Sequence, residues 1–423
     1  MKSLDQIEAR TPISSVPFTV ATSGSYYLTK NLNVSSGNAI TISANGVTLD
    51  LNGFTITSSA ASAVGTAILI SGPQKDIAIS NGHIVSGVTR SGGTYSGSGF
   101  ASGISYSAAE PSNVRVSNVS VSGCLLDGIS IGRFDGTVVE SCTVKTVGNL
   151  GIFAQNVSNS IVLDCGDTGF AATTVSNCYG ASTIGPAITA STVSNSYGIS
   201  SGSAGVSAIT ATNCYGQSSS SVGLSAGTAH NCYGSSTTGT GLSATDASNS
   251  YGYSPAGGTG LAAESASNCH GESASSGATG MNITRTATGC YGVATSGIGL
   301  NVTGTATGCH GTSNSGTGLV AHVASNSVGV SSSGIGLNAS RMAIGCSGAS
   351  TSGTWGLSTV IAQNCYGQTT NDNSGLNAAL RSNVAIGSYA VNPGLGPSIR
   401  TVVAVACDPS GDNVYQYFYN MPF

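Results

Sequence analysis

Apolar residues recur at a regular spacing through the second half of the chain. One apolar residue, most often Leu, returns every 18 to 20 residues, and in most repeats a small or branched residue follows two positions later. Alternation with a period of two is typical of a β-strand, and the Gly that closes each short run permits a sharp corner. The recurring position is occupied by Phe170, Ile188, Val206, Leu224, Leu242, Leu261, Met281, Leu300, Leu319, Leu337, Leu357 and Leu376.

We therefore predict a parallel β-solenoid, in which each repeat forms one coil of short strands that meet at corners. A single coil has too few apolar side chains to fold alone, whereas stacked coils share a continuous interior. Neighbouring coils are expected about 4.8 Å apart, so equivalent residues should lie above one another. The pattern thus indicates an all-β protein.

The tetrapeptide Asn-Cys-Tyr-Gly marks the same place in these coils. Its second position is Cys in most repeats and Ser in the others, in steps of 18 to 21 residues. We interpret it as a column of small buried side chains, because free Cys behaves as a small apolar residue. Disulfides between neighbouring coils remain an alternative. A metal site is disfavoured, since no two Cys have the Cys-x₂₋₄-Cys spacing of zinc sites. The column comprises Cys178, Ser196, Cys214, Cys232, Ser250, Cys269, Cys290, Cys309, Ser327, Cys346 and Cys365.

Asn precedes this column in most coils, and Gly replaces it at residues 289, 308 and 345. Both residue types tolerate a left-handed backbone, so we predict a corner at which side-chain amides stack into an Asn ladder. The ladder would contain Asn177, Asn195, Asn213, Asn231, Asn249, Asn268, Asn326 and Asn364.

Tyr follows the Cys column in most coils. If Cys points inward, the next residue points outward, so we predict a file of aromatic side chains on one outer face. The rings either stack between coils or offer a platform for sugar rings. His270 and His310 occupy the same position in later coils. The candidate binding residues are Tyr179, Tyr197, Tyr215, Tyr233 and Tyr251.

Charged residues make up only 7% of the 423 residues, with 12 Lys and Arg, 16 Asp and Glu and a formal net charge of −4. No basic stripe is present, so nucleic acid is not expected as a partner. No run reaches the length of a membrane span. The first ten residues lack the hydrophobic stretch of a signal peptide, which leaves either a cytosolic chain or numbering that starts at the mature form. The sequence predicts no cofactor and leaves the oligomeric state open.

The N-terminal half adds a specific resemblance. The segments GSYYLTKNL, AITISANGVTLDLNGFTI and ISNGHIVSG resemble the opening coils of secreted right-handed parallel β-helix proteins of the pectate-lyase-like superfamily. The Cys-Tyr-Gly repeats and the closing YNMP resemble a group of bacterial β-helix repeat proteins of unassigned function. The resemblance implies a right-handed parallel β-helix at an extracellular or cell-surface location.

We predict one domain in four parts. Leu4 and Ile7 lie three residues apart, which suits one amphipathic turn over the first coil. The Gly- and Ser-rich residues 92–103 should form a loop that projects from the stack. The aromatic cluster at 415–419 suits a lid on the last coil. The parts are an N-terminal cap (1–22), wider irregular coils (23–167), regular Cys-Tyr-Gly coils (168–382) and a C-terminal cap (383–423).

The resemblance also implies how a catalytic site would be built. Lyases of this fold combine acidic Ca²⁺ ligands with an Arg or Lys base, and hydrolases use paired carboxylates. Acidic residues are densest within 127–167, where Asp127, Asp164 and Asp167 are the catalytic candidates. The chain lacks an adjacent acid pair, Gly-His-Gly and Arg-x-Pro-x-x-Arg.

These observations favour a non-enzymatic extracellular or surface β-helix that is structural or binds polysaccharide or a cell-surface glycan. The alternative is a divergent polysaccharide lyase or glycoside hydrolase that uses the acids of 127–167. A minor alternative is ice or surface binding through flat Thr arrays, since Thr-Ala-Thr occurs at 210–212, 286–288 and 305–307.

Overall fold

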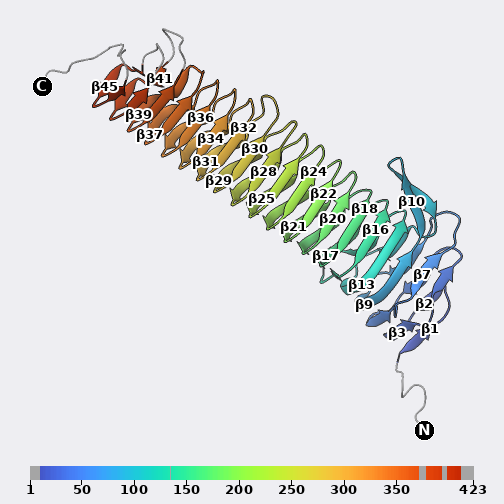
Figure 1. Ribbon diagram of the computed structural model, residues 1–423. Coiled ribbons are helices and arrows are strands. Elements are labelled where there is room, and N and C mark those ends of the chain that lie inside the picture. The colour runs from blue at the N-terminus through green and yellow to red at the C-terminus, as the bar shows by residue number, and fades with distance from the viewer. Residues whose placement is uncertain (1–9, 134, 371–377, 393–397, 411–423) are drawn as a thin grey trace. The chain divides into compact units, whose positions relative to one another are not determined.

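A computed structural model describes residues 10–133, 135–370, 378–392 and 398–410. All regular structure in these ranges is β-strand, and it divides into two units, residues 1–216 and 217–423, each of which is a parallel β-solenoid (Figure 1). The amphipathic turn predicted at Leu4 and Ile7 and the aromatic cluster predicted at 415–419 lie outside the described residues.

The first coils of unit 1 contain three strands each. The strands of this unit are β1 (Thr11–Ile13), β2 (Phe18–Val20), β3 (Gly24–Leu28), β4 (Leu32–Val34), β5 (Ile40–Ile42), β6 (Val47–Asp50), β7 (Thr55–Ser58), β8 (Thr66–Ser71), β9 (Lys75–Val85), β10 (Gly87–Ser91), β11 (Thr94–Ser98), β12 (Ser102–Ser107), β13 (Ser112–Cys124), β14 (Ile129–Gly132), β15 (Val138–Glu140), β16 (Thr143–Val147), β17 (Ile152–Ser158), β18 (Ile161–Cys165), β19 (Phe170–Ser176), β20 (Tyr179–Ser182), β21 (Ile188–Ser194), β22 (Tyr197–Ser200) and β23 (Val206–Thr212). Strand β24 (Tyr215–Ser218) begins in unit 1 and ends in unit 2.

The coil changes shape at β17. This strand pairs in parallel with both β14 and β15, so one long strand replaces two strands of the preceding coil. From β17 to β24 each coil consists of one long strand of seven residues and one shorter strand, as in β19 and β20. Unit 1 therefore has three-strand coils before β17 and two-strand coils from β17.

Unit 2 repeats the two-strand coil over most of its length. Its strands are β25 (Leu224–His230), β26 (Tyr233–Ser236), β27 (Leu242–Ser248), β28 (Tyr251–Ser254), β29 (Leu261–Ser267), β30 (His270–Ser273), β31 (Met281–Thr288), β32 (Tyr291–Ala294), β33 (Leu300–Thr307), β34 (His310–Ser313), β35 (Leu319–Ser325), β36 (Val328–Ser331), β37 (Leu337–Ile344), β38 (Ser347–Ser350), β39 (Trp355–Gln363), β40 (Tyr366–Thr369), β41 (Ala378–Arg381), β42 (Val384–Ile386), β43 (Tyr389–Val391), β44 (Ile399–Arg400), β45 (Val403–Val405) and β46 (Asp408–Ser410). The two-strand coil continues as far as β40, after which β41 and β42 both pair with β39 and the coils contain three short strands.

Parallel pairing extends into both predicted caps. Strand β1 pairs with β3 and strand β2 with β5, although both precede residue 23. At the other end, β45 pairs with β42 and β46 with β43, beyond residue 382. The ends of the parallel pairing therefore do not coincide with the predicted boundaries at 22 and 382.

The two sheets of a narrow coil approach each other very closely. Gly234 follows the Tyr of β26, and a Cβ built on it would lie 2.3 Å from the carbonyl oxygen of Gly241, which precedes β27. Any side chain at Gly234 would therefore push two backbones apart. The tetrapeptide ends in Gly because the interior is too thin at this point for a side chain.

The Leu and Cys positions form the remaining interior, as predicted. Leu224, Leu300 and Leu337 are fully buried, and their strands pair in register with Leu opposite an apolar residue in every neighbouring coil of unit 2. All twelve cysteines are free thiols, and every one except Cys407 is buried.

The structure also shows why Ser can replace Cys. The hydroxyl of Ser250 accepts a hydrogen bond from the backbone N–H of Cys232, at 3.1 Å, and donates one to the carbonyl oxygen of Ser248, at 2.8 Å. Ser196 and Ser327 bond in the same way to the N–H groups of Cys178 and Cys309. The replacement therefore exchanges a small apolar group for a fully bonded hydroxyl.

The predicted left-handed corner is confirmed. Asn177, Asn213 and Asn268 have φ of 54°, 53° and 52°, and Gly289 has φ of 61° at the equivalent position. The amide of Asn213 donates to the side-chain oxygen of Asn195 at 3.0 Å, one step of the predicted ladder.

A second buried column lies four residues after the Cys column. Ser200 donates its hydroxyl to the carbonyl oxygen of Gly185 at 2.8 Å and accepts a bond from the N–H of Ser203 at 3.0 Å. These bonds close the corner between the short strand and the next coil. The column contains Ser182, Ser200, Ser218, Ser236, Ser254, Ser273, Ser313, Ser331 and Ser350.

Candidate functional site

A hairpin leaves the solenoid of unit 1 and lies over its short strands. Strands β10 and β11 pair antiparallel, with Arg90 opposite Tyr95. The Tyr95 side chain packs against Gly148 and Gly166 of two successive coils. Its hydroxyl donates to Asp164 Oδ1 at 3.0 Å and lies 3.3 Å from Thr183 Oγ1. Residues 92–103 were predicted as a projecting loop, and the projecting element is the hairpin formed by residues 87–98.

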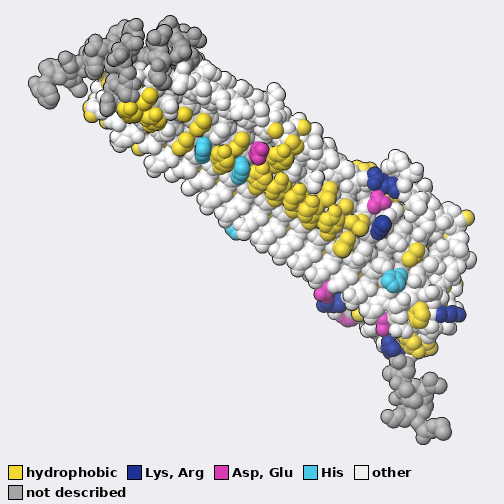
Figure 2. Space-filling model, in the orientation of Figure 1, with side chains coloured by type: hydrophobic (Ala, Val, Ile, Leu, Met, Phe, Trp, Pro, Cys, Tyr) yellow, Lys and Arg dark blue, Asp and Glu magenta, His cyan; other side chains and the backbone are white. Residues whose placement is uncertain are grey.

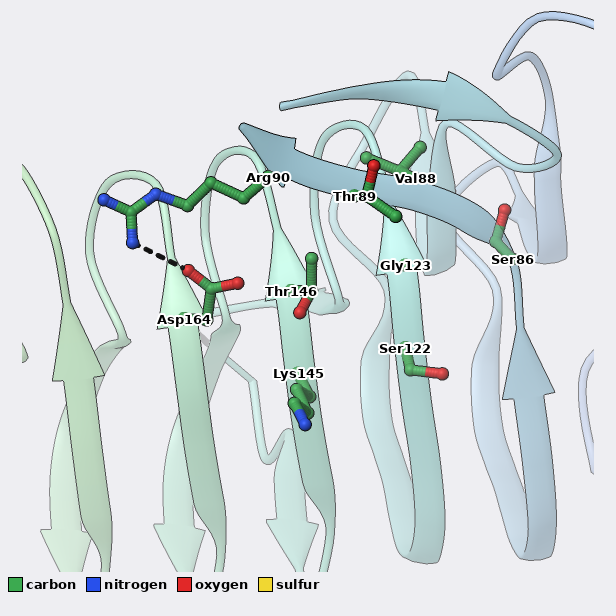
Figure 3. Close-up of a pocket in the computed structure, with 9 residues that line it drawn as sticks. All are labelled: Ser86, Val88, Thr89, Arg90, Ser122, Gly123, Lys145, Thr146 and Asp164. Atoms are coloured by element: carbon green, nitrogen blue, oxygen red, sulfur yellow. Dashed lines mark hydrogen bonds and ion pairs between the residues drawn. The ribbon is translucent and has the colours of Figure 1, made fainter. Parts of the chain in front are cut away.

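An open hollow of about 470 Å³ lies beside this hairpin (Figure 3). Its floor comes from the ends of β13, β16 and β18, which are consecutive strands of one sheet. Arg90 reaches from the hairpin to Asp164, with 3.1 Å between Nη1 and Oδ1. The lining residues are Ser86, Val88, Thr89, Arg90, Ser122, Gly123, Lys145, Thr146 and Asp164.

The charges of the hollow leave one cation in excess. Arg90 is paired with Asp164, whereas Lys145 is exposed and makes no ion pair within the described residues. Burial raises the pKa of Tyr95, and the charge of Asp164 adds to the rise. Tyr95 therefore keeps its proton and remains a hydrogen-bond donor to Asp164. The hollow combines an unpaired ammonium group with hydroxyl groups of Ser and Thr.

The aromatic file of unit 1 borders the same sheet. Tyr179 and Tyr197 are stacked, with ring centroids 5.2 Å apart and planes 6° apart. Tyr197 and Tyr215 stack at 4.3 Å and 6°. The Tyr197 ring is therefore stacked between two neighbouring rings. The preceding coil places exposed Ile161 opposite Tyr179, so the file begins beside the hollow.

The corresponding file of unit 2 is tilted from Tyr233 to His310, whereas Tyr366 and Tyr389 are stacked. Tyr233 and Tyr251 lie 5.0 Å apart with planes at 59°, and Tyr251 and His270 lie 4.7 Å apart at 44°. The hydroxyl of Tyr251 donates to Glu272 Oε2 at 2.7 Å. Burial lowers the pKa of His270, so this ring is neutral at pH 7. Figure 2 shows His side chains within a file of hydrophobic side chains.

The three candidate acids have separate environments. Asp127 Oδ1 accepts bonds from the Asn149 amide at 2.7 Å and from the Leu150 N–H at 3.2 Å, and burial raises the pKa of Asp127. Asp164 is held by Arg90 and Tyr95, and Asp167 accepts from Thr168 at 3.5 Å. Within the described ranges no hydrogen bond links any two of these acids.

Two of the Thr-Ala-Thr segments lie on neighbouring coils of unit 2. Thr286 pairs with Thr305 and Thr288 with Thr307, and all four are exposed. The next coil places Val323 opposite Thr305. This array of threonines is therefore two coils deep.

Sequence reasoning missed the residues that build the hollow. Arg90 and Tyr95 come from two short runs around Gly92 and Gly93, which is a hairpin signal. Lys145 could not be singled out from the sequence, because its lack of an ion pair depends on which acid Arg90 contacts.

Comparisons with known proteins did not assign the chain to a family. A scan against protein families found none that matches the chain, and searches of curated proteins and of solved structures found no significant similarity. Over the described ranges, no His, Cys, Asp or Glu side chains group in a way that could hold a metal ion. The same ranges contain no helix of the length and hydropathy needed to cross a membrane.

Proposed function

We propose that this protein is a non-enzymatic extracellular or cell-surface solenoid that binds polysaccharide through unit 1. The relation to right-handed parallel β-helices of the pectate-lyase-like superfamily is part of this proposal. The observation that carries it is the hollow beside the hairpin, which is lined by exposed Lys145 together with Ser and Thr side chains.

The chemistry of the hollow favours an acidic polysaccharide. A uronate carboxylate would pair with Lys145, and the sugar hydroxyls would bond to Ser122, Thr146 and Thr89. Tyr edges and the exposed Ile161 side chain on the neighbouring coils add apolar area along the path of a chain.

The buried thiols are compatible with an oxidising location. Free cysteines persist outside the cell only where oxidants cannot reach them. Cys178, Cys232 and Cys309 are 2–4% exposed, and the remaining cysteines of the column are enclosed to a similar degree. Burial therefore removes the usual objection to a Cys-rich extracellular chain without disulfides.

Retention of the full chain in gels that contain polygalacturonate, alginate or a neutral glucan tests the proposal. We expect retention by the acidic polymers that weakens with salt, and Lys145→Ala should weaken it about tenfold. Lys30→Ala is the matched control, because Lys30 is an equally exposed lysine that does not line the hollow. No retention by either acidic polymer removes the proposal.

A divergent lyase or hydrolase is the second candidate. It is favoured by Asp127, because burial raises the pKa of this carboxyl in the direction that a general acid requires. Incubation with uronate and neutral glycans would then release unsaturated products or reducing ends. Activity that survives the triple change of Asp127, Asp164 and Asp167 to Ala would exclude these residues.

A further inference from the structure

An uncharged surface continues the floor of the hollow along unit 1. Lys145 pairs in register with Leu163, and Thr143 pairs with Ile161, so the strand next to the hollow presents two apolar side chains on its outer face. On the following coil, Ile161 pairs with Tyr179. We call this surface the apolar strip. It consists of Ile161, Leu163, Tyr179, Ala181, Tyr197 and Ile199.

The apolar strip is open to solvent. Ile161 is 42% exposed and Tyr179 is 36% exposed, and the other four side chains are half-buried. Tyr179 pairs with Tyr197 and Ala181 pairs with Ile199, so the strip continues without interruption to β22. Figure 2 shows hydrophobic side chains gathered into a file that begins beside charged side chains. From the hollow to the far end of the strip is about 14 Å, which is longer than one sugar ring.

The β10–β11 hairpin borders one edge of the strip. Tyr95 packs against Gly148 and Gly166, which directly follow β16 and β18. Its hydroxyl also lies 3.3 Å from the hydroxyl of Thr183, which directly follows β20. The hairpin therefore runs beside the ends of three successive short strands, and a polymer that enters the hollow is guided along the strip rather than across it.

The strip offers no positive charge to a ligand. Lys145 is the last Lys or Arg before Arg285, so residues 146–216 of unit 1 contain neither residue type. The charged residues in that range are the acids Asp164 and Asp167. A carboxylate over the strip would lose hydration without gaining a partner, and these acids would repel it. The hollow can therefore accept one carboxylate, whereas the strip disfavours a second.

We propose that the acidic polysaccharide of unit 1 carries its carboxylates far apart, with one at Lys145 and neutral sugar residues over the apolar strip. The C–H groups of a neutral sugar suit Ile161 and the Tyr rings, and its hydroxyls suit the Tyr hydroxyls. A polyuronate has a carboxylate on every residue, so only one at a time would find a cation. This inference rests on the proposed function and specifies the charge spacing of the ligand.

Polygalacturonate and alginate with carboxyl groups reduced to primary alcohols provide matched ligands, because reduction removes charge and leaves the backbone in place. Retention of the full chain is measured in gels that contain each polymer at graded extents of reduction. We expect retention to peak at an intermediate extent, about threefold above the unreduced polymer, because neutral residues then lie over the strip. Complete reduction should give the weakest retention, since no carboxylate remains for Lys145.

Ile161→Lys places a cation on the strip. It should raise retention by the unreduced polymers about two- to fivefold, the gain from one exposed ion pair, and move the peak toward less reduced material. Ile209→Lys is the matched control, because Ile209 is 66% exposed on the long strand β23 and adds the same charge away from the strip. Thermal unfolding of both variants checks the fold, and Tyr179→Lys replaces Ile161→Lys if the latter lowers the midpoint.

Three results would overturn the inference. The first is retention that is greatest for the unreduced polymers and falls with each step of reduction, which would leave the proposed function standing. The second is an equal gain from Ile161→Lys and Ile209→Lys, because position on the strip would then not matter. The third is a dimer in sedimentation that Ile161→Lys dissociates, since the strip would then join two copies of the chain. Absence of retention at every extent of reduction removes the proposed function itself.

Discussion

Unit 1 and unit 2 use the same two-strand coil but differ in what is attached to it. Unit 1 contains 18 of the 28 charged residues, the β10–β11 hairpin and the loop at residues 133–137, whereas unit 2 contains 10 charged residues. The regular coil has almost no freedom for chemistry, since its interior is filled by Gly, Ser, Cys, Ala and one or two larger apolar residues. The hollow that we propose as a binding site therefore lies where an element leaves the coil.

Labelling of the cysteine thiols tests whether the interiors of units 1 and 2 are equally inaccessible to reagents. Among the predictions for the two units, this one has the largest expected effect. Burial raises the pKa of Cys124 and of Cys165 from 9.0 to about 12, which lowers the thiolate fraction about a thousandfold. At pH 8, iodoacetamide should label Cys407 alone in the native chain and all twelve thiols in urea. Mass spectrometry of peptides assigns each label.

The same thiols predict a pH dependence of stability. Their folded-state pKa exceeds the unfolded value, so their contribution is fully present below pH 9 and is lost as the pH rises toward 12. Unit 1 should therefore unfold more easily in this alkaline range.

In the labelling experiment, modification of Cys124 or Cys165 in the native chain at pH 8 would show that reagents reach the interior of unit 1.

The thin interior of unit 2 predicts the next largest effect. Gly234→Val should destabilise this unit by about 3 kcal/mol or more, because the new side chain must separate two backbones. Ser235→Val on the same strand is the matched control, since this side chain points outward and β-branched residues suit strands. Urea unfolding measures both variants, and equal midpoints would mean that the two sheets are not in contact at Gly234.

Replacement of Ser in the Cys column should have the smallest effect. Ser250→Ala removes the acceptor of the Cys232 N–H and should cost about 1–3 kcal/mol, whereas Ser250→Cys should cost less, because Cys occupies the column elsewhere. Urea unfolding again provides the measurement. If Ser250→Ala leaves the free energy of unfolding unchanged, the Cys232 N–H must find another hydrogen-bond acceptor. Ser and Cys in the column would then differ only in polarity.

The repeat could be predicted from the sequence because its constraints are local. Leu224, Cys232 and Asn231 each report one property, namely burial, small size and left-handed backbone, and each recurs at a fixed step. The buried Ser column was equally periodic but was missed, because Ser is mostly found exposed or in turns. Its bonds to carbonyl groups of the preceding coil become visible only once the coils are stacked.

The contacts of Arg90 and Arg133 could not be predicted in the same way. The pairing of Arg90 with Asp164 joins residues 74 positions apart, and no periodicity links them. The contact of Arg133 with Phe153 depends on the register of β17 against β14 and β15. These contacts follow from the way coils of unequal length are stacked.

The loop at residues 133–137, opposite Gln155, shows how such a chain can accept inserted residues. Parallel pairing resumes at Val138 and Asn156 as though nothing had been inserted, so neighbouring layers need no adjustment when one corner lengthens. Closing a few extra residues into a loop has a small entropic cost. Insertions at corners can therefore accumulate one at a time, and each can bring new side chains to the surface while the strands beneath keep their register.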